Sequence, residues 1–306
     1  MTFGVDDIGD LTGKVFVVTG ANSGLGLVTT RRLAARHGHV VMACRSLDKA
    51  NRARDEVLRQ EPLASVEVMP LDLASLDSIA RFEEAFAHER IDGLCNNAGV
   101  MAIPRRETAD GFEMQLGTNH LGHFALTARL WPRLVETAGA RVVNVSSLMH
   151  RVGRMHFDDL MGERRYDKWA AYGQSKLSNL LFTFELRRRA EAAGAPVIVA
   201  AAHPGYAATN LQQVGPEMSG NPFMKRLMAV ANRLVAQDAE GGALPQLRAL
   251  VGDGVVSGDY FGPSRFEIVG PPKRVSCSRR ARDEDAARRL WEASLELTGV
   301  DYPGLD

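Results

Sequence analysis

The chain has 306 residues, of which 45% are hydrophobic, and its 37 basic and 37 acidic side chains give a formal net charge of zero. This length and composition suffice for one large α/β domain with a substantial core. The balanced charge lacks the broad electrostatic attraction on which nucleic-acid-binding proteins depend, so no nucleic-acid partner is expected.

The first predicted element is a strand at residues 14–19 (KVFVVT), which leads directly into a glycine-rich turn and then a helical pattern that extends to His37. Glycines permit a tight turn and allow the backbone to approach a diphosphate. Free N–H groups at the start of the next helix attract its negative charge. The pattern therefore favours a dinucleotide-binding loop over a plain strand-to-helix turn. The expected cofactor contacts here are Gly20, Asn22, Ser23, Gly24, Leu25 and Gly26.

The second predicted strand, residues 39–44 (HVVMAC), ends where a fold that prefers NAD places a carboxylate for the ribose 2′-hydroxyl. Cys44 stands at that place and Arg45 follows it. A guanidinium suits a 2′-phosphate because its planar donors match the phosphate oxygens. We therefore expect NADP(H) to be preferred over NAD(H), with a solvated loop cation as the alternative interpretation of Arg45.

Strands and helices continue to alternate along the rest of the chain. Further strands are predicted at residues 93–96, 141–145, 196–202 and near 258–261. The longer helices are predicted at residues 119–136, 172–192 and 283–297. This alternation predicts a single-domain Rossmann fold over residues 1–306, in which helices cover both faces of a doubly wound parallel sheet of about seven strands. Such sheets bind ligands at the C-terminal ends of their strands.

Residues 172–176 (YGQSK) place Tyr172 and Lys176 four positions apart, and this spacing puts both side chains on one face of a helix. An ammonium near a phenol favours the phenolate and lowers the phenol pKa from its usual value of about 10. The pair is therefore a candidate for proton exchange with a carbonyl or an alcohol. Taken alone, it would more often be a solvated helix edge.

Several motifs in one order make the chain resemble the short-chain dehydrogenase/reductase family from about residue 13 to residue 263. The motifs are TGxxxGxG at residues 19–26, Asp72-Leu73, NNAG at residues 96–99, Asn119 in an NxxG context, Ser146-Ser147, YxxxK at residues 172–176, and Pro204-Gly205 with Thr209.

The resemblance implies a role for each of these residues. Ser147 would polarise the substrate carbonyl, Tyr172 would donate or remove the proton, and Lys176 would bind the nicotinamide ribose and lower the tyrosine pKa. Asn119 would hold a water that links Lys176 to solvent. Ser147 is preferred to Ser146 because the catalytic serine of the family is the second of such a pair. The other implied cofactor contacts are Asp72, Leu73, Asn97, Ala98, Gly99, Pro204, Gly205 and Thr209.

Residues 148–171, between the serine and the tyrosine, form an insertion that many members of the family lack. Together with His203-Pro-Gly, this insertion resembles the branch of retinol dehydrogenases and protochlorophyllide reductases, including its bacterial relatives. The branch implies a bulky, lipophilic substrate such as a polyene, prenyl or steroid-like aldehyde or ketone. Residues 206–238 are the expected substrate lid. The methionines expected to join it, unless they only pack the core, are Met101, Met149 and Met155.

The predicted function is NADP(H)-dependent interconversion of a carbonyl and an alcohol by hydride transfer. Two alternatives remain, a non-catalytic NADP(H)-binding redox sensor and a protochlorophyllide-type double-bond reductase. In many relatives the helices at residues 119–136 and 172–192 form subunit interfaces, so a homodimer or homotetramer is possible, as is a monomer. The natural substrate and the physiological direction are open.

The remaining polar residues predict neither a disulfide framework nor a metal site. The cysteines at 44, 95 and 277 are odd in number and lack CxxC spacing, which is typical of a reducing cytoplasm. His120 and His123 have HxxH spacing, but no cysteine or carboxylate completes a recognisable ligand set. Residues 1–13 contain no long apolar run, so we expect a soluble, cytoplasmic protein without a membrane anchor.

Overall fold

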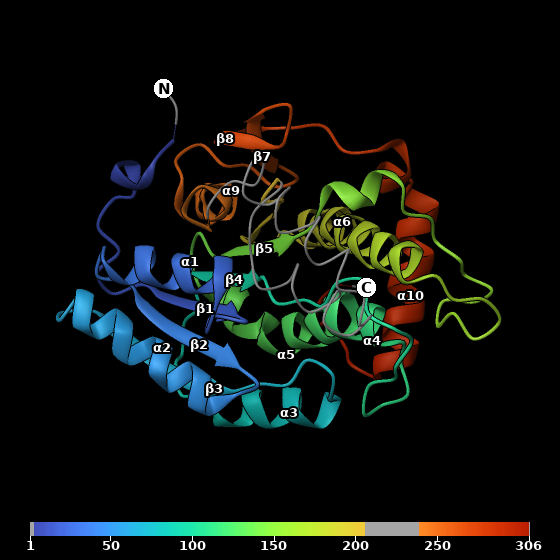
Figure 1. Ribbon diagram of the computed structural model, residues 1–306, viewed down its shortest axis with the longest axis horizontal. Helices are drawn as coiled ribbons and strands as arrows, with labels where there is room; N and C mark the ends of the chain where they lie inside the picture. Colours follow the sequence, from blue (N-terminus) through green and yellow to red (C-terminus); the bar gives the residue numbers. More distant parts are fainter. Residues whose placement is uncertain (1–2, 206–238, 306) are drawn as a thin grey trace, which may run out of the picture.

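Strands and helices alternate along the chain in the computed structural model, which describes residues 3–205 and 239–305 (Figure 1). The strands are β1 (Val15–Thr19), β2 (His39–Cys44), β3 (Ser65–Pro70), β4 (Gly93–Asn96), β5 (Arg141–Val145), β6 (Ile198–Ala202), β7 (Tyr260–Arg265) and β8 (Val269–Arg274). The α-helices are α1 (Gly24–Ala34), α2 (Leu47–Gln60), α3 (Leu76–Ala85), α4 (Met114–Leu116), α5 (Gly122–Glu136), α6 (Lys168–Ala192), α9 (Ala239–Val251) and α10 (Glu284–Thr298). The other helical turns are η1 (Val5–Asp7), η2 (Gly117–Leu121), η3 (Leu148–Arg151) and η4 (Arg279–Arg282).

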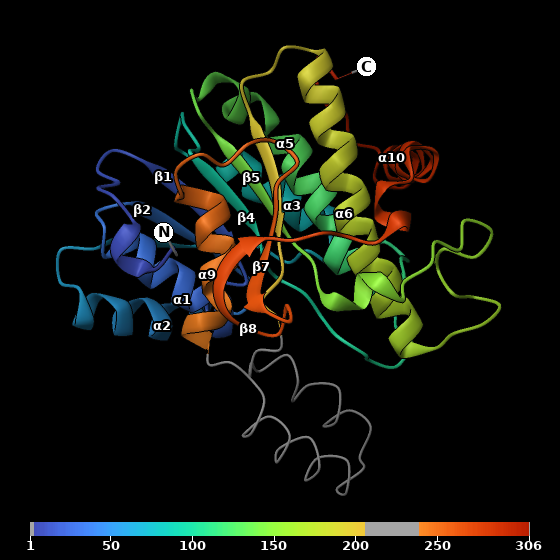
Figure 2. The ribbon, with the colours of Figure 1, turned by 90° about the horizontal axis from the view of Figure 1, so that it is seen from above.

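The strands form one sheet in the order β3-β2-β1-β4-β5-β6-β7-β8. Strands β1 to β7 pair in parallel, which confirms the predicted doubly wound Rossmann-like fold. Strand β8 was not predicted; it pairs antiparallel with β7 and lies next to α9 (Figure 2). Its sequence, VGPPKR, contains two prolines, which argue against a strand except at the edge of a sheet, where β8 lies.

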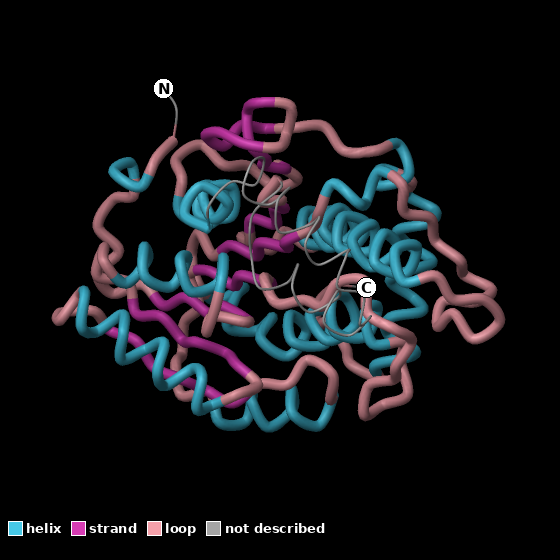
Figure 3. Tube along the Cα trace, in the orientation of Figure 1, coloured by secondary structure: helices cyan, strands magenta, loops and turns pink. Residues whose placement is uncertain are grey.

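Alternate residues of the central strands enter two separate cores. Val15 and Val17 of β1 pack into one core with side chains of α3, α5 and α6, whereas Phe16 and Val18 pack into the other with side chains of α1, α2 and α9. Helices therefore cover both faces of the sheet (Figure 3). This two-sided burial explains the continuous apolar runs of these strands in the sequence.

The helix that carries Tyr172 begins earlier than the sequence suggested. Asp167 caps α6, since its carboxylate accepts hydrogen bonds from the backbone N–H groups of Trp169 and Ala170. Tyr172 therefore lies in the second turn of α6 rather than at its start. The outer side of α6 packs against α10, where Trp291 contacts Phe182 with ring centroids 6.2 Å apart.

The helix predicted at residues 119–136 is divided in two. Residues 117–121 form the π-helical turn η2, and α5 begins only at Gly122. A Cβ atom at Gly122 would overlap the Leu73 carbonyl, so only glycine permits this close approach. A π-helical turn widens the backbone at Asn119, and such turns often occur at functional sites.

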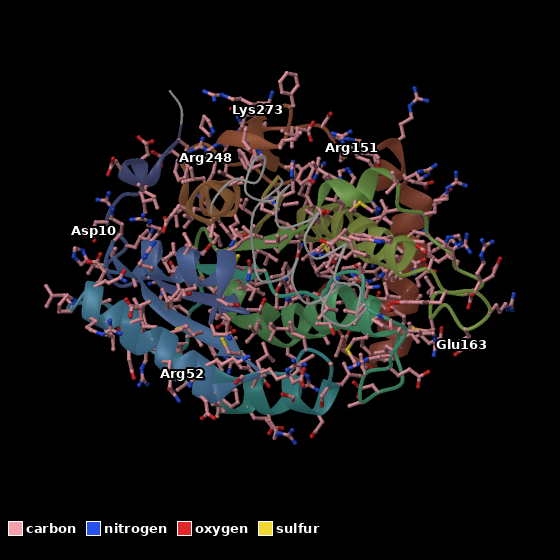
Figure 4. The ribbon with its side chains drawn as sticks, viewed as in Figure 1. Asp10, Arg52, Arg151, Glu163, Arg248 and Lys273 are labelled. Atoms are coloured by element: carbon pink, nitrogen blue, oxygen red, sulfur yellow. The ribbon has the colours of Figure 1, made fainter. Side chains whose placement is uncertain are left out.

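The insertion predicted at residues 148–171 extends from the end of β5 to the first turn of α6. Figure 4 labels Glu163 on its outer part, at the periphery of the molecule. Met155 packs against the core that includes Leu177 and Leu180 of α6, in agreement with the core alternative that the sequence left open for it. Met101 and Met149 are half-buried. The lid predicted at residues 206–238 lies outside the described residues.

Across the described ranges, no helix has both the length and the apolar character that crossing a bilayer requires.

Candidate active site

Six of the strands bring predicted site residues to one edge of the sheet. In each case the residue lies within two positions of the strand end, and the strands are parallel, so all six meet at the C-terminal edge. These residues are Gly20, Arg45, Asp72, Asn97, Ser147 and Pro204. The strand order reverses between β1 and β4, which is where ligands bind in open α/β sheets.

Tyr172, Ser147 and Lys176 lie together at this edge. The side chain of Ser147 lies close enough to the Tyr172 phenol to interact with it, and its Oγ accepts from the Met149 N–H at 3.3 Å. The neighbouring Ser146 points elsewhere, and its hydroxyl donates to the backbone carbonyl of Lys176 at 2.7 Å. The Lys176 Nζ atom donates to the Val145 carbonyl at 3.1 Å and lies 5.8 Å from the centroid of the Tyr172 ring. Helix α6 thus presents the phenol and the ammonium to the end of β5.

Burial dominates the ionisation of this pair. It raises the pKa of Tyr172 to about 12, although the interaction with the Ser147 side chain acts in the opposite direction. It also lowers the pKa of Lys176 to about 8. Lys176 was expected to lower the tyrosine pKa, whereas burial of the phenol raises it here. The phenol is therefore protonated at neutral pH in this geometry.

Asn119 joins the loop after β4 to helix α6. Its Nδ2 donates to the Val100 carbonyl and to Ser175 Oγ, both at 2.9 Å, and its Oδ1 accepts from the Val100 N–H at 2.8 Å. A Cβ atom built on Gly99 would lie 3.0 Å from Asn119 Oδ1 and 3.5 Å from Lys176 Nζ. Asn119, Gly99 and Lys176 are therefore close neighbours. The water-holding role implied for Asn119 stays a prediction.

His123 links the glycine turn to Asn119, a connection that the sequence analysis did not predict. Its Nδ1 lies 3.0 Å from the Asn119 carbonyl, which can only accept, so Nδ1 carries the proton and Nε2 accepts from Thr19 Oγ1 at 2.9 Å. Thr19 Oγ1 in turn accepts from the N–H groups of Asn97 and Ala98 at 2.9 Å. Burial lowers the pKa of His123 to about 4, so its ring stays neutral.

The two histidines of the HxxH pair point toward different partners, since His120 Nε2 contacts Ser294 Oγ of α10 at 2.9 Å. The position of His123, four residues after Asn119, does not reveal its role, because its contact with Thr19 joins residues that are far apart in the sequence. Neither histidine belongs to a cluster of three metal-ligand side chains among the described residues.

The glycine turn has the backbone geometry that a phosphate-binding loop needs. Gly20 and Gly24 have φ values of +65° and +53°, which disfavour any side chain. A Cβ atom at Gly26 would overlap the Gly20 carbonyl, so the helix can approach the turn this closely only with glycine. Ser23, the N-cap residue of α1, makes no side-chain capping bond, and the N–H groups of the first turn are available to an anion. These features fit a dinucleotide diphosphate.

Cys44 and Arg45 differ in their exposure to solvent. Cys44 is buried, which raises the pKa of its thiol to about 11, although hydrogen bonds from the backbone of Ala21 and Asn22 oppose the shift. Arg45 is exposed, and its guanidinium has no ion-pair partner in the part of the chain that the structure describes. A free guanidinium beside the glycine turn fits a ribose 2′-phosphate.

His150 is a hydrogen-bonding loop residue, as its sequence suggests, and its partner is the backbone of Ser147. It is fully buried, its Nδ1 donates to the Ser147 carbonyl at 2.7 Å, and its Nε2 accepts from the Ser278 N–H at 3.2 Å. In the sequence, only the spacing of three residues between Ser147 and His150 pointed to a contact between them. Ser278 comes from a distant segment, so its contribution could not be seen without the fold.

The other predicted cofactor residues that the structure describes also lie at the C-terminal edge of the sheet. Asp72 Oδ1 accepts from the Ala74 N–H at 3.0 Å, and Leu73 is buried. Gly205 has a φ value of +69°, and its N–H donates to His203 Nδ1 at 3.1 Å. Thr209 lies outside the described residues.

Comparisons with known proteins agree with this geometry. The sequence profile of the family described as short chain dehydrogenase matches residues 14–219. Human retinol dehydrogenase 13 is 40% identical over 96% of this chain and 87% of its own length, and human retinol dehydrogenase 12 is 41% identical over 95% and 88%. The crystal structure of an uncharacterized protein from Mycobacterium paratuberculosis is 42% identical, with a TM-score of 0.82 over 99% of this chain and 100% of that one.

Proposed function

Because the chain belongs to the short-chain dehydrogenase family, whose members oxidise alcohols or reduce carbonyls with a nicotinamide cofactor, we propose that it is an NADP(H)-dependent enzyme for an apolar carbonyl/alcohol pair. The observation that carries the proposal is that the Ser147 side chain interacts with the Tyr172 phenol while the Lys176 ammonium lies 5.8 Å from the centroid of the phenol ring. These are a proton donor, a second hydrogen-bond donor for the same oxygen, and a nearby positive charge.

The residues of this chain would handle the proton and the charge on the substrate oxygen. A bound nicotinamide cofactor supplies or accepts the hydride. In the direction of reduction, Ser147 donates a hydrogen bond to the carbonyl oxygen and Tyr172 transfers its phenolic proton to it. The phenolate that remains is stabilised by Ser147 and by Lys176. Oxidation follows the same path in reverse, with the phenolate as the base.

The preference for NADP(H) rests on Arg45. The turn at Gly20–Gly26 and the first N–H groups of α1 would hold the diphosphate, and Arg45 would bind the 2′-phosphate through its planar donors. Cys44 leaves no carboxylate at the end of β2 to bind a 2′-hydroxyl or to repel a phosphate.

The apolar substrate is supported by the relatives named as retinol dehydrogenases and by the side chains near the phenol. Met149 lies two positions after Ser147, and Met101 follows Val100, whose backbone Asn119 binds. Trp169 precedes Tyr172 by three positions on α6 and is 39% exposed, so an apolar ring lies one turn from the catalytic phenol. Such side chains suit a lipophilic group better than a sugar.

The decisive experiment follows the absorbance of reduced nicotinamide with NADPH and NADH in parallel, against lipophilic aldehydes and ketones and small hydrophilic carbonyls. We expect NADPH oxidation with the lipophilic group of substrates, abolished in Tyr172→Phe. Turnover confined to small hydrophilic carbonyls would contradict the substrate class. Tight NADPH binding with no dark turnover of any carbonyl would contradict the catalytic proposal and leave the sensor or a light-dependent reductase.

The cellular location and the oligomeric state belong to the same proposal. The three cysteines are all free, as expected for a reducing cytoplasm, and cell fractionation tests this location. Helix α10 packs on α6, and the Tyr302 hydroxyl that follows it donates to the Phe124 carbonyl of α5 at 2.8 Å. Part of the surface that forms subunit interfaces in relatives is thus covered within the chain, which favours a monomer; sedimentation tests this.

A further inference from the structure

Three side chains of metal-ligand type meet at the opposite edge of the sheet from the proposed active site. His39 is the first residue of β2, Glu67 lies on β3, and His88 lies in the loop after α3. His88 Nε2 is 2.8 Å from Glu67 Oε1, and His39 Nε2 is 3.8 Å from the same oxygen. One ligand atom from each residue lies within 4.8 Å of the other two. Two imidazole nitrogens therefore face one carboxylate oxygen.

Neighbouring residues fix the orientation of both rings. His39 Nδ1 contacts Ser65 Oγ at 2.7 Å, and the two imidazole rings lie with centroids 4.7 Å apart. Phe86 packs edge-on against the His88 ring at 5.3 Å. A hydrogen bond at the far nitrogen of a histidine is the usual way in which proteins orient a metal ligand.

The Nε2 atom of His39 is buried and makes no hydrogen bond in the described structure, although it faces Glu67. Buried polar nitrogens are nearly always satisfied by a partner, so this atom needs an explanation. The simplest alternative is that Glu67 only pairs with His88 and that His39 has no part in a site. That alternative accounts for the 2.8 Å contact but not for the convergence of His39 on the same oxygen.

We propose that His39, Glu67 and His88 form a binding site for a divalent transition-metal ion of the Zn²⁺ class. Zinc binds imidazole nitrogens and carboxylate oxygens at about 2.0–2.2 Å, which separates tetrahedral ligands by roughly 3.3 Å. The observed separations of 2.8 Å and 3.8 Å lie on either side of this value, so each needs to change by only about 0.5 Å. Imidazole ligands favour Zn²⁺, Ni²⁺ or Cu²⁺ over Mg²⁺ or Ca²⁺.

The ion would join three segments that are distant in the sequence, namely β2, β3 and the loop between α3 and β4. Both histidine side chains are 25% exposed, so an ion and a fourth ligand from water can reach them. The site lies at the N-terminal ends of the strands and shares no residue with the C-terminal edge. It therefore does not depend on the proposed catalytic function, and its expected effect is on stability.

The test is a Zn²⁺ titration of chelator-treated protein by calorimetry, with Co²⁺ absorption spectroscopy as a second measurement. We expect about one Zn²⁺ per chain and a higher melting temperature with the metal. In His39→Ala and Glu67→Gln the affinity should fall about 10-fold or more, because each variant removes one ligand while Glu67→Gln can still accept a hydrogen bond from His88. The Co²⁺ spectrum should lack a thiolate band, which would otherwise indicate Cys277.

The matched control is His37→Asn, which removes a histidine two residues away that contacts Asp10 at 3.1 Å in a simple pair. His37 has a φ value of +68°, and asparagine tolerates this conformation well. The affinity of the His37→Asn variant for Zn²⁺ should equal that of the unchanged protein. No binding, or binding that is equally strong in His39→Ala, Glu67→Gln and His37→Asn, would overturn the proposal and leave an ordinary pair of Glu67 with His88.

Discussion

The two edges of the parallel sheet differ in whether their charged side chains have partners of opposite charge. At the C-terminal edge, Lys176 is buried, and in the described part of the chain neither it nor Arg45 has a carboxylate partner. At the N-terminal edge, Asp92 accepts a hydrogen bond from the Val15 N–H at 2.9 Å and pairs with Arg90, and Glu67 faces two histidines. The uncompensated cations suit an anionic cofactor, whereas the paired charges at the other edge stabilise the fold. The proposed active site and these paired charges therefore lie at opposite ends of the strands.

The largest effect is expected from Tyr172→Phe at the C-terminal edge. The substitution removes the proton donor and leaves the ring, so kcat should fall by about 10²–10⁴-fold while the fold is kept. Steady-state rates and circular dichroism measure the two effects. The matched control is Tyr302→Phe, which deletes a buried hydroxyl bonded to Phe124. It should lower stability and leave kcat unchanged; a comparable loss of kcat in both variants would remove the special role of Tyr172.

The second prediction concerns the buried charge of Lys176. Its pKa falls from 10.5 to about 8 in the folded chain, so below about pH 8 the lysine is charged in both states and its burial lowers stability. Lys176→Met should therefore raise the free energy of unfolding at neutral pH by roughly 3 kcal/mol at most, and should abolish activity. As the pH rises from about 8 to about 10.5, the folded lysine is neutral while the unfolded one stays protonated, so the unchanged protein should regain this difference.

Denaturant unfolding at neutral and alkaline pH measures the difference between the two proteins. The Tyr172 phenol has a raised pKa of about 12, so its own contribution is lost between about pH 10 and pH 12 and overlaps only the upper end of the lysine window. A Lys176→Met protein that is less stable at neutral pH would show that the contact of Nζ with the Val145 carbonyl outweighs the cost of desolvation.

The same two edges also differ in how far the sequence predicted them. The C-terminal edge could be predicted because its residues follow strands in short motifs, and β2, β4 and β5 have the predicted bounds. The proline-containing β8 and the π-helical turn at residues 117–121 were missed, because in each the fold overrides local propensity. The raised pKa of Tyr172 was missed because burial depends on the whole fold.

At the N-terminal edge the sequence offered no motif. His39, Glu67 and His88 are separated by more than twenty residues at each step and meet only because β2 and β3 are paired in register and the loop after α3 returns beside them. The contact of His150 with Ser278 and that of His123 with Thr19 are of the same kind. Contacts between distant segments, rather than residue types, are what the sequence could not supply.

The third prediction tests the stabilising edge through Asp92. This carboxylate is 8% exposed and binds both the Val15 N–H and the Arg90 guanidinium. Asp92→Ala leaves the Val15 N–H without its acceptor, so the free energy of unfolding should fall by about 1–3 kcal/mol with kcat unchanged. Asp10→Ala, at an exposed pair with His37, should cost less than about 0.5 kcal/mol. Equal effects of the two variants would deny that burial makes Asp92 important.

The smallest effect is expected from Arg45→Ala, and it is also the most specific. Losing one exposed charge contact to a 2′-phosphate should weaken NADPH binding about 10-fold and leave NADH binding unchanged, because only NADPH carries that phosphate. Arg52→Ala is the control, since Arg52 is also exposed but lies on α2 (Figure 4). Fluorescence titrations with both cofactors at two salt concentrations measure the change, and the effect of Arg45 should shrink as salt screens the contact. If Arg45→Ala weakens both cofactors equally, Arg45 acts on the shared diphosphate and the basis for preferring NADP(H) is lost.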